Sequence, residues 1–329
     1  MAVSHPVQMM TTRRCACDPD AMSAIALSEA QFRALFDRLQ RMSGQGSADR
    51  RGALNNISAA GVVAAASDVW RGHTVSLAAP IESEVSADNP EPAVHQMTQW
   101  AGDAGPSGLS FATDRLAMNV HGNADSHLDA LCHVIFDGRL YNGIAADAVT
   151  AAGAAELSID VAAQGIASRG LLLDIPRLRG VPWLEPGDHV TADDLLAAES
   201  AQGDRIQEGD LLFVRVGHRA RRRSLGAWDA AQARAGLHPA ALELLAERRI
   251  AVLGSDGNND TAPSAAQGVD FPVHVLAINA MGLHLLDYLE FDALVGLCEE
   301  LRRWSFLCVV APLRLSGGTG SPVNPIAIF

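Results

Sequence analysis

The sequence predicts an α/β protein, and three observations favour this fold class. Segments with helical periodicity alternate with short apolar segments between residues 158 and 315, as expected when helices connect the strands of one sheet. Apolar residues make up 48% of the 329 residues, which allows a substantial core in one large domain or two ordinary ones. Glycine and alanine are abundant and aromatic residues make up only 5%, which indicates close packing. These patterns do not distinguish a doubly wound sheet from other α/β arrangements.

Periodicity and capping signals place the expected elements. Ser28 begins a helix that runs to about Met42, with Gln31 in the position that completes a capping box. Residues 82–110 are rich in proline and glycine, and we expect a long loop that closes over a substrate with Trp100. Further helices are expected near residues 59–70, 145–154, 158–166, 191–201, 239–248, 281–289 and 292–302, and strands near 73–81, 170–175, 210–216, 249–253 and 304–315.

The domain organisation follows from the composition of the N-terminal region. Residues 1–20 show no packing pattern, and residues 43–51 form a linker rich in glycine, serine and charge. We therefore expect residues 1–50 to form an N-terminal extension with one helix, and residues 51–329 to form the main domain.

Charge and cysteine usage restrict the partners and the compartment. The chain has 25 basic and 38 acidic residues, a net charge of −13, which disfavours binding to nucleic acid. The Arg221-Arg222-Arg223 run is interpreted as a solvated surface. Five scattered cysteines, among them Cys15 and Cys17 without a second pair for zinc, indicate a reducing compartment. Without a hydrophobic signal region or a long apolar segment, we expect a cytoplasmic protein with no membrane contact.

Residues 121–133 carry the densest chemistry in the chain, with three histidines and two aspartates among thirteen residues. His127, Asp129 and His133 are separated by even numbers of residues, and in an extended backbone even spacing places side chains on one face. Imidazole and carboxylate together suit a divalent ion such as zinc or manganese. The alternative is a polar loop with one core histidine. Because burying three ionisable groups together is costly unless they are paired, the metal site is favoured.

The remaining ligands must come from elsewhere in the chain. His274 lies in an apolar segment and Asp287 follows thirteen residues later, although either could be structural, as a core histidine or a helix cap. Asp256 and Asp260 follow an expected strand, where sites in α/β proteins collect. Cys132 is expected to pack in the core, because on a strand it would point away from His127 and its partners. Residues 317–320 do not match a phosphate-binding loop and are interpreted as a turn.

The segment from Ser126 to His133 resembles the motif of the cyclase-family metal-dependent hydrolases, which include bacterial kynurenine formamidases and isatin hydrolases. The similarity continues through the Asp137-Gly138 and Tyr141-Asn142-Gly143 positions and covers about residues 50–329. Further matches are Gly52-Ala53-Leu54-Asn55, Val75-Ser76-Leu77, Gly170-Leu171-Leu172-Leu173-Asp174, Glu208-Gly209-Asp210-Leu211-Leu212-Phe213-Val214-Arg215, Ser255-Asp256 and Pro312-Leu313-Arg314. The resemblance implies a swivelling β/α domain with a mixed, partly barrel-like sheet and surrounding helices.

The resemblance also implies roles for single residues. His127 and Asp129 become metal ligands and His133 the proton-transfer residue, while His274 and Asp287 stand near the family's late ligands. The family's first histidine would fall on Asn123, whereas His121 lies two residues earlier; we expect His121 to be the ligand. Asp287 replaces the family's glutamate, so either one or two ions, zinc or manganese, are compatible with the sequence.

Three functions remain open at this point. The first is hydrolysis of a carbon–nitrogen bond in a small amide, imide or lactam, with metal-activated water and His133 as general acid and base. The second is a metal-dependent cyclase or lyase that acts on a polyketide-like carbonyl substrate. The third is a binding protein with a structural metal, which the mixed His/Asp ligand set disfavours. The resemblance implies a homodimer or homotetramer with a small-molecule substrate.

Overall fold

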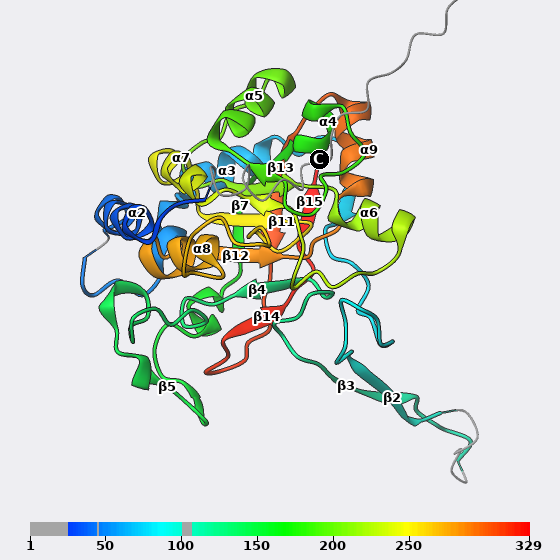
Figure 1. The fold of residues 1–329 in the computed structure, drawn as a ribbon. Helices are drawn as coiled ribbons and strands as arrows, with labels where there is room; N and C mark the ends of the chain where they lie inside the picture. Colours follow the sequence, from blue (N-terminus) through cyan, green and yellow to red (C-terminus); the bar gives the residue numbers. More distant parts are fainter. Residues whose placement is uncertain (1–25, 45, 101–106) are drawn as a thin grey trace, which may run out of the picture.

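The computed structural model describes residues 26–44, 46–100 and 107–329, so Cys15 and Cys17 lie outside the described residues. A nine-stranded mixed sheet, curled into a half-barrel, forms the centre of the molecule (Figure 1). Helices surround the sheet, and the expected mixed, partly barrel-like α/β fold is confirmed. The described residues contain no helix that is both long and apolar enough to cross a membrane.

The central strands of the sheet are parallel, and the outer strands are antiparallel to their neighbours. The strand order is β1 (Thr74–Ser76), β15 (Ile326–Ile328), β13 (Ser305–Val310), β7 (Ile166–Asp174), β9 (Leu211–Arg215), β11 (Val252–Ser255), β12 (His284–Asp287), β4 (His127–Asp129) and β14 (Gly320–Pro322). The parallel pairs are β7–β9, β9–β11 and β11–β12. Their apolar residues are buried, as expected for strands that are covered on both faces.

Two sequence predictions about this sheet are corrected. Residues 281–289 were expected to form a helix, but His284–Asp287 form strand β12 between β11 and β4. The expected strand at residues 304–315 is shorter, because β13 ends at Val310. The segment His284-Leu285-Leu286-Asp287 is too short for periodicity to distinguish a helix from a buried strand.

The helices expected near residues 28–42, 59–70, 191–201, 239–248 and 292–302 are present. Residues 145–154 and 158–166 were also expected to be helical, but they form only short 3-10 turns and two-residue strands. Helix α2 (Glu29–Met42) begins at Ser28 with the expected capping box, and α5 (Ala192–Gln202) begins in the same way at Thr191. The other helices are α3 (Ala59–Ser67), α4 (Ile175–Arg179), α6 (His218–Leu225), α7 (Leu242–Arg248), α8 (Pro272–His274) and α9 (Asp292–Leu301). Helix α8 continues into a π-helical segment, η6 (Val275–Ala280).

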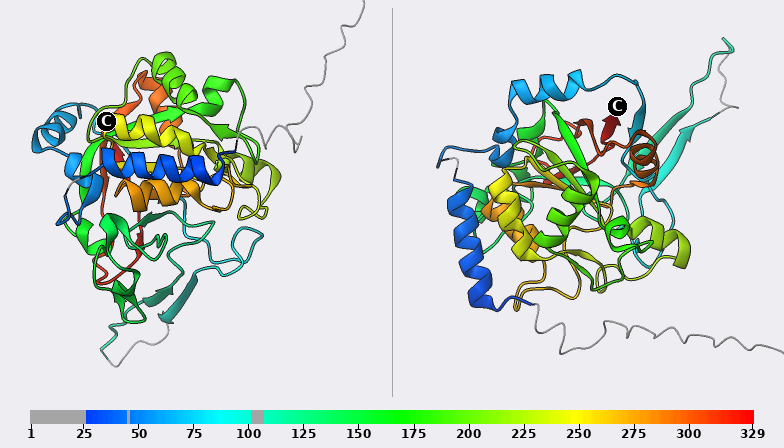
Figure 2. Two further views of the ribbon diagram at one scale, coloured as in Figure 1. Left: turned by 60° about the vertical axis from the view of Figure 1, so that its left-hand side comes forward. Right: turned by 90° about the horizontal axis from the view of Figure 1, so that it is seen from above.

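The N-terminal helix packs on the main domain. Helix α2 lies beside α7 and η6 (Figure 2). Its apolar stripe, Phe32, Leu35 and Leu39, is buried in the same core as the sheet. This stripe therefore links the predicted N-terminal extension to the segment that follows His274.

Part of the expected loop at residues 82–110 is a strand, which lies at residues 94–99. Strand β2 (Val94–Gln99) pairs antiparallel with β3 (Thr113–Ala117), and this hairpin projects from the body of the protein (Figure 1). Smaller elements complete the fold: strands β5 (Val149–Thr150), β6 (Gly153–Ala154), β8 (His189–Val190) and β10 (Gly236–Leu237), and 3-10 turns at Gly52–Asn56, Tyr141–Gly143, Ala146–Ala148, Ile159–Ala162 and Pro239–Ala241.

Candidate metal centre

Two neighbouring strands bring three of the predicted ligands together. His127 and Asp129 lie two residues apart on β4, so their side chains point to the same face. Strand β12 pairs antiparallel with β4 and places Asp287 directly opposite His127. All three residues are buried, at 3%, 0% and 1% exposure respectively. The sheet register, which joins segments 160 residues apart, therefore builds the floor of the site.

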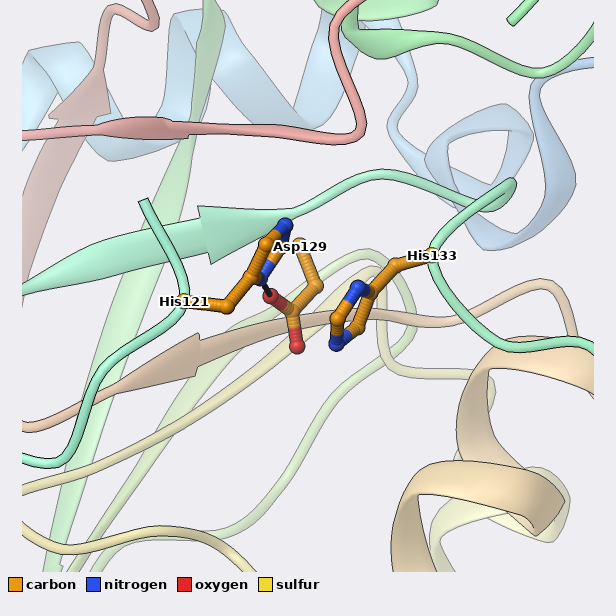
Figure 3. A group of neighbouring side chains, drawn as sticks. All are labelled: His121, Asp129 and His133. Atoms are coloured by element: carbon orange, nitrogen blue, oxygen red, sulfur yellow. Dashed lines mark hydrogen bonds and ion pairs between the residues drawn. The ribbon is translucent and has the colours of Figure 1, made fainter. Parts of the chain in front are cut away.

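Asp129 is the centre of the cluster. Its Oδ1 lies 2.9 Å from Nδ1 of His121 (Figure 3). The same oxygen lies 3.6 Å from Nε2 of His127. Its Oδ2 lies 3.4 Å from Nε2 of His274 and has no hydrogen-bond partner among the described residues. Burial alone would raise the pKa of Asp129, but the imidazoles around it, His133 first, hold that pKa well below its usual range.

The structure places His121, and not Asn123, beside Asp129. His121 lies on the loop before β4, and its ring points toward the carboxylate (Figure 3). The side chain of Asn123 instead accepts a hydrogen bond of 2.9 Å from the hydroxyl of Tyr288. The predicted choice of His121 thus agrees with its position, while its role as a ligand stays a prediction.

The orientation of the His127 ring follows from its other contact. Nδ1 lies 2.9 Å from the backbone carbonyl oxygen of Asp125. A carbonyl oxygen can only accept, so Nδ1 carries a proton, and Nε2 is the ring nitrogen that faces the cluster. It lies 3.6 Å from the Asp129 carboxylate. An imidazole nitrogen and a carboxylate that face each other in a buried site form a donor set that fits a divalent ion.

His274 is the last residue of α8, and its ring is held by Asp260. Its Nδ1 lies 2.6 Å from Oδ2 of Asp260, whose carboxylate also accepts from the backbone N–H groups of Val273 and His274. Its Nε2 lies 3.4 Å from both Asp129 and Asp287. Burial would lower the pKa of His274, but the carboxylates, Asp287 first, raise it well above its usual value.

Asp287 is fixed by two asparagines that the sequence did not single out. The side-chain amide of Asn258 donates to Oδ2 of Asp287, and that of Asn259 donates to Oδ1. Both hydrogen bonds are 2.6 Å long. Both asparagines follow β11, at the strand end where Asp256 and Asp260 were noted. Asp260 supports His274 there, whereas Asp256 lies away from the cluster and accepts the N–H of Val216 at 2.7 Å.

His133 lies just beyond β4, half-buried and next to His121 (Figure 3). The two rings are stacked, with centroids 3.6 Å apart. Burial disfavours the imidazolium and, with a partial offset from Asp129, lowers the pKa of His133 to about 4. A neutral imidazole beside the cluster can accept a proton near neutral pH.

Among the described residues, two groups of side chains are spaced to hold a metal ion, and both contain Asp129. One consists of His121, Asp129 and His133, and the other of His127, Asp129 and Asp287. Within each group the possible ligand atoms lie within 4.8 Å of one another. The nitrogens of His121, His127 and His274 that face the Asp129 carboxylate support the same conclusion, that these residues can bind a divalent ion.

A pocket of about 540 Å³ opens above these groups. Its lining combines the histidines with apolar side chains. The apolar lining residues are Val134, Ile135, Phe136, Val269, Phe271 and Val275. None of the described residues in the 82–110 region lines this pocket. The expected closure of that region over a substrate, with Trp100, therefore finds no support in the structure.

Cys132 has the packing role that the sequence predicted. Its side chain is 1% exposed, and its Sγ lies 3.8 Å from the carbonyl oxygen of Gly318. Burial raises the pKa of this thiol to about 11, which disfavours the thiolate required for metal binding or nucleophilic attack.

Comparison with known proteins identifies the family. The family model described as "Putative cyclase" matches residues 54–259, more than half of the chain. The chain belongs to the cyclase family. No curated protein sequence matches the cyclase-family chain described here.

Solved structures share the fold of this cyclase-family protein. A novel cyclase has 29% sequence identity and a TM-score of 0.78, over 89% of this chain and 99% of its own. Isatin hydrolase A from Labrenzia aggregata has 20% identity and a TM-score of 0.58, over 78% and 93% of the two chains. Isatin hydrolase A from Ralstonia solanacearum has 21% identity and a TM-score of 0.55, over 78% and 91%.

Proposed function

We propose that this protein is a metal-dependent hydrolase that cleaves a carbon–nitrogen bond in a small amide, imide or lactam. The observation that carries the proposal is the environment of Asp129. This fully buried carboxylate has Nδ1 of His121 and Nε2 of His127 at one oxygen and Nε2 of His274 at the other, at 2.9, 3.6 and 3.4 Å. A carboxylate that faces three imidazole nitrogens beneath a pocket supports a divalent ion at the reaction centre.

The proposed ligands are His121, His127 and Asp129, with His274 and Asp287 on the other side of the Asp129 carboxylate. One or two ions, zinc or manganese, fit this donor set. When bound, such an ion lowers the pKa of a coordinated water molecule and polarises a carbonyl group.

His133 is the proposed general acid and base. Its ring is neutral near pH 7, because burial lowers its pKa to about 4. In hydrolysis, water adds to the carbonyl carbon, and the carbon–nitrogen bond then breaks. His133 accepts the proton that the attacking water gives up and donates it to the leaving nitrogen, so that a carboxylic acid and an amine are formed.

The shape and polarity of the pocket support a small, partly apolar substrate. Phe136 and Phe271 contribute aromatic surface to the lining of the pocket. A volume of about 540 Å³ is in the range of small-molecule sites. Two structures with a similar fold are isatin hydrolases, and isatin is a planar lactam, which makes cyclic amides suitable first substrates for this chain.

The test is hydrolysis of a panel of amides, imides and lactams by zinc-loaded and manganese-loaded protein. The expected result is a product heavier than the substrate by one water, formed only with metal present. The alternative function is that of a cyclase or lyase on a polyketide-like carbonyl compound, which the family description and the 29% identical cyclase favour. That function gives a product with unchanged mass or with loss of water, so product mass distinguishes the two.

A further inference from the structure

The segment Thr319–Gly320 lies against the ring of His121. Oγ1 of Thr319 is 3.0 Å from Nε2 of His121, a contact between residues 198 positions apart. The backbone carbonyl of Thr319 accepts the N–H of Ala130, and Gly320 pairs with Asp129 in the β14–β4 ladder. The start of β14 is therefore attached directly to the strand that carries the site.

Gly320 provides a second, independent contact with the same ring. A Cβ atom at this position would lie 2.8 Å from Cε1 of His121 and 2.7 Å from the carbonyl oxygen of Leu128. Neither distance is compatible with a real side chain unless a neighbour moves. The missing side chain of Gly320 therefore leaves the space that the imidazole occupies.

Two further imidazoles that face Asp129, those of His127 and His274, are oriented in the same way as each other. His127 is held by the carbonyl oxygen of Asp125 and His274 by the carboxylate of Asp260, each through Nδ1. In both rings the remaining nitrogen points at Asp129. For His121 the orientation is reversed, because Nδ1 points at Asp129 and Nε2 at Thr319.

We propose that Thr319 and Gly320 are positioning residues for His121. The inference rests on the proposed metal centre, in which Nδ1 of His121 is a ligand. A ligand imidazole presents one unprotonated nitrogen to the ion and donates its other N–H to a fixed acceptor. The Thr319 hydroxyl supplies that acceptor, and Gly320 fixes the plane of the ring.

A hydroxyl suits this position because it can both accept and donate. Nδ1 of His121 lies 2.9 Å from Oδ1 of Asp129, and Nε2 lies 3.0 Å from Oγ1 of Thr319. If Nδ1 were a ligand, Nε2 would donate to this hydroxyl oxygen, and the ring would keep its present orientation. Because His133 stacks on this ring, the same two residues also set the position of the proposed acid and base.

The experiment compares metal affinity among Thr319→Val, Thr319→Ser and wild type, by competition of zinc and of manganese with a chelator. Thr319→Val keeps the shape and removes the hydroxyl, so we expect roughly tenfold or greater loss of affinity. Thr319→Ser restores the hydroxyl and should restore the affinity. Because these are binding measurements, turnover is not required for the readout.

Ser321→Ala is the matched control. Its hydroxyl lies two residues further along β14, is buried, and binds the N–H of Leu313 and the carbonyl of Pro322, away from His121. Ser321→Ala should lower the thermal stability of the metal-free protein and leave the metal affinity unchanged. Thr319→Val should show the reverse pattern, which a purely structural role of the hydroxyl would not produce. Thr319→Ala provides a second variant without the hydroxyl if Thr319→Val does not fold.

His121→Ala separates failure of this inference from failure of the metal centre. If His121→Ala binds zinc and manganese as tightly as wild type, His121 is not a ligand, and both the proposed ligand set and the positioning role are wrong. If His121→Ala loses affinity and Thr319→Val does not, the positioning role alone is overturned. If Thr319→Ser is as weak as Thr319→Val, the hydroxyl is likewise not the determinant.

Discussion

The imidazole rings of His121 and His133 lie face to face, with their centroids 3.6 Å apart and their planes inclined by only 8° (Figure 3). His121 reaches the Asp129 carboxylate through Nδ1, and the stack places His133 at the edge of the same cluster. The spacing of these three side chains also suits a metal ion, so His133 has two conceivable roles. Metal content and turnover, measured together, distinguish them.

Replacing His133 should affect turnover and not metal content. We expect His133→Ala and His133→Gln in metal-loaded protein to lower turnover by about 100-fold or more, the usual effect of losing a general acid and base. Metal content, measured by atomic spectroscopy after dialysis, should equal that of wild type. Turnover close to wild type would exclude the proton-transfer role, whereas loss of the metal would make His133 a ligand.

Asp129 and Asp287 should differ in their effect on metal binding. Asp129 belongs to both groups of possible ligands, while Asp287 belongs to one. Asp129→Asn, which keeps the shape and removes the charge, should therefore abolish metal binding and turnover. Asp287→Asn should reduce metal content only in part.

The measurement is metal content per subunit, together with turnover before and after chelation and again after addition of zinc or manganese. Asp256→Asn is a suitable control, because that carboxylate is also buried but binds the N–H of Val216 outside the cluster. Full metal content in Asp129→Asn would contradict the proposed centre.

The sequence predicted that His127 and Asp129 share one face of a strand, but it did not predict the neighbouring strand that carries Asp287. Alternation along a strand places His127 and Asp129 on one face, and the structure agrees. Asp287 was predicted as a member of the site but assigned to a helix. Its strand is defined by pairing with β11 and β4, whose residues lie far away in the sequence. Short apolar segments carry no local information about such partners.

Within the arginine run, the interpretation of Arg222 was wrong for the same reason. Arg222 lies on α6 and was expected to be a solvated surface residue, but it binds the carboxylates of Glu82 and Asp88, and Asp88 is buried. These partners lie 134 to 140 residues earlier in the chain. A local charge pattern predicts that arginines need counter-charges, but it does not say which segment supplies them.

Helix α2 should be required for the stability of the main domain. Phe32 is fully buried and its ring packs edge to face against Phe136, 5.9 Å away between centroids, and Phe136 lines the pocket. We expect Phe32→Ala to lower the free energy of unfolding by about 3–5 kcal/mol, the usual cost of removing a buried phenyl ring. Asp37→Ala, on the exposed face of the same helix, should change it by less than about 0.5 kcal/mol.

Urea unfolding followed by circular dichroism measures both variants. Equal stability of Phe32→Ala and wild type would show that the N-terminal helix is an appendage. A large loss would show that residues 29–42 belong to the folding unit of the main domain.

Asp256 should make the protein less stable as the pH rises. Burial raises the pKa of this carboxyl from its usual 3.8 to about 6, with a partial offset from Arg215. The folded state thus holds the proton more tightly than the unfolded state, so the stabilisation is complete below about pH 4 and is lost as the pH rises through 6. At about 1.4 kcal/mol per pH unit, the loss is on the order of 3 kcal/mol.

Asp256→Asn can still accept the Val216 N–H without ionising, and it should be more stable than wild type at pH 7.5. Urea unfolding from pH 4 to 8 checks this, and an advantage that shrinks with rising pH would mean that attraction to Arg215 outweighs burial.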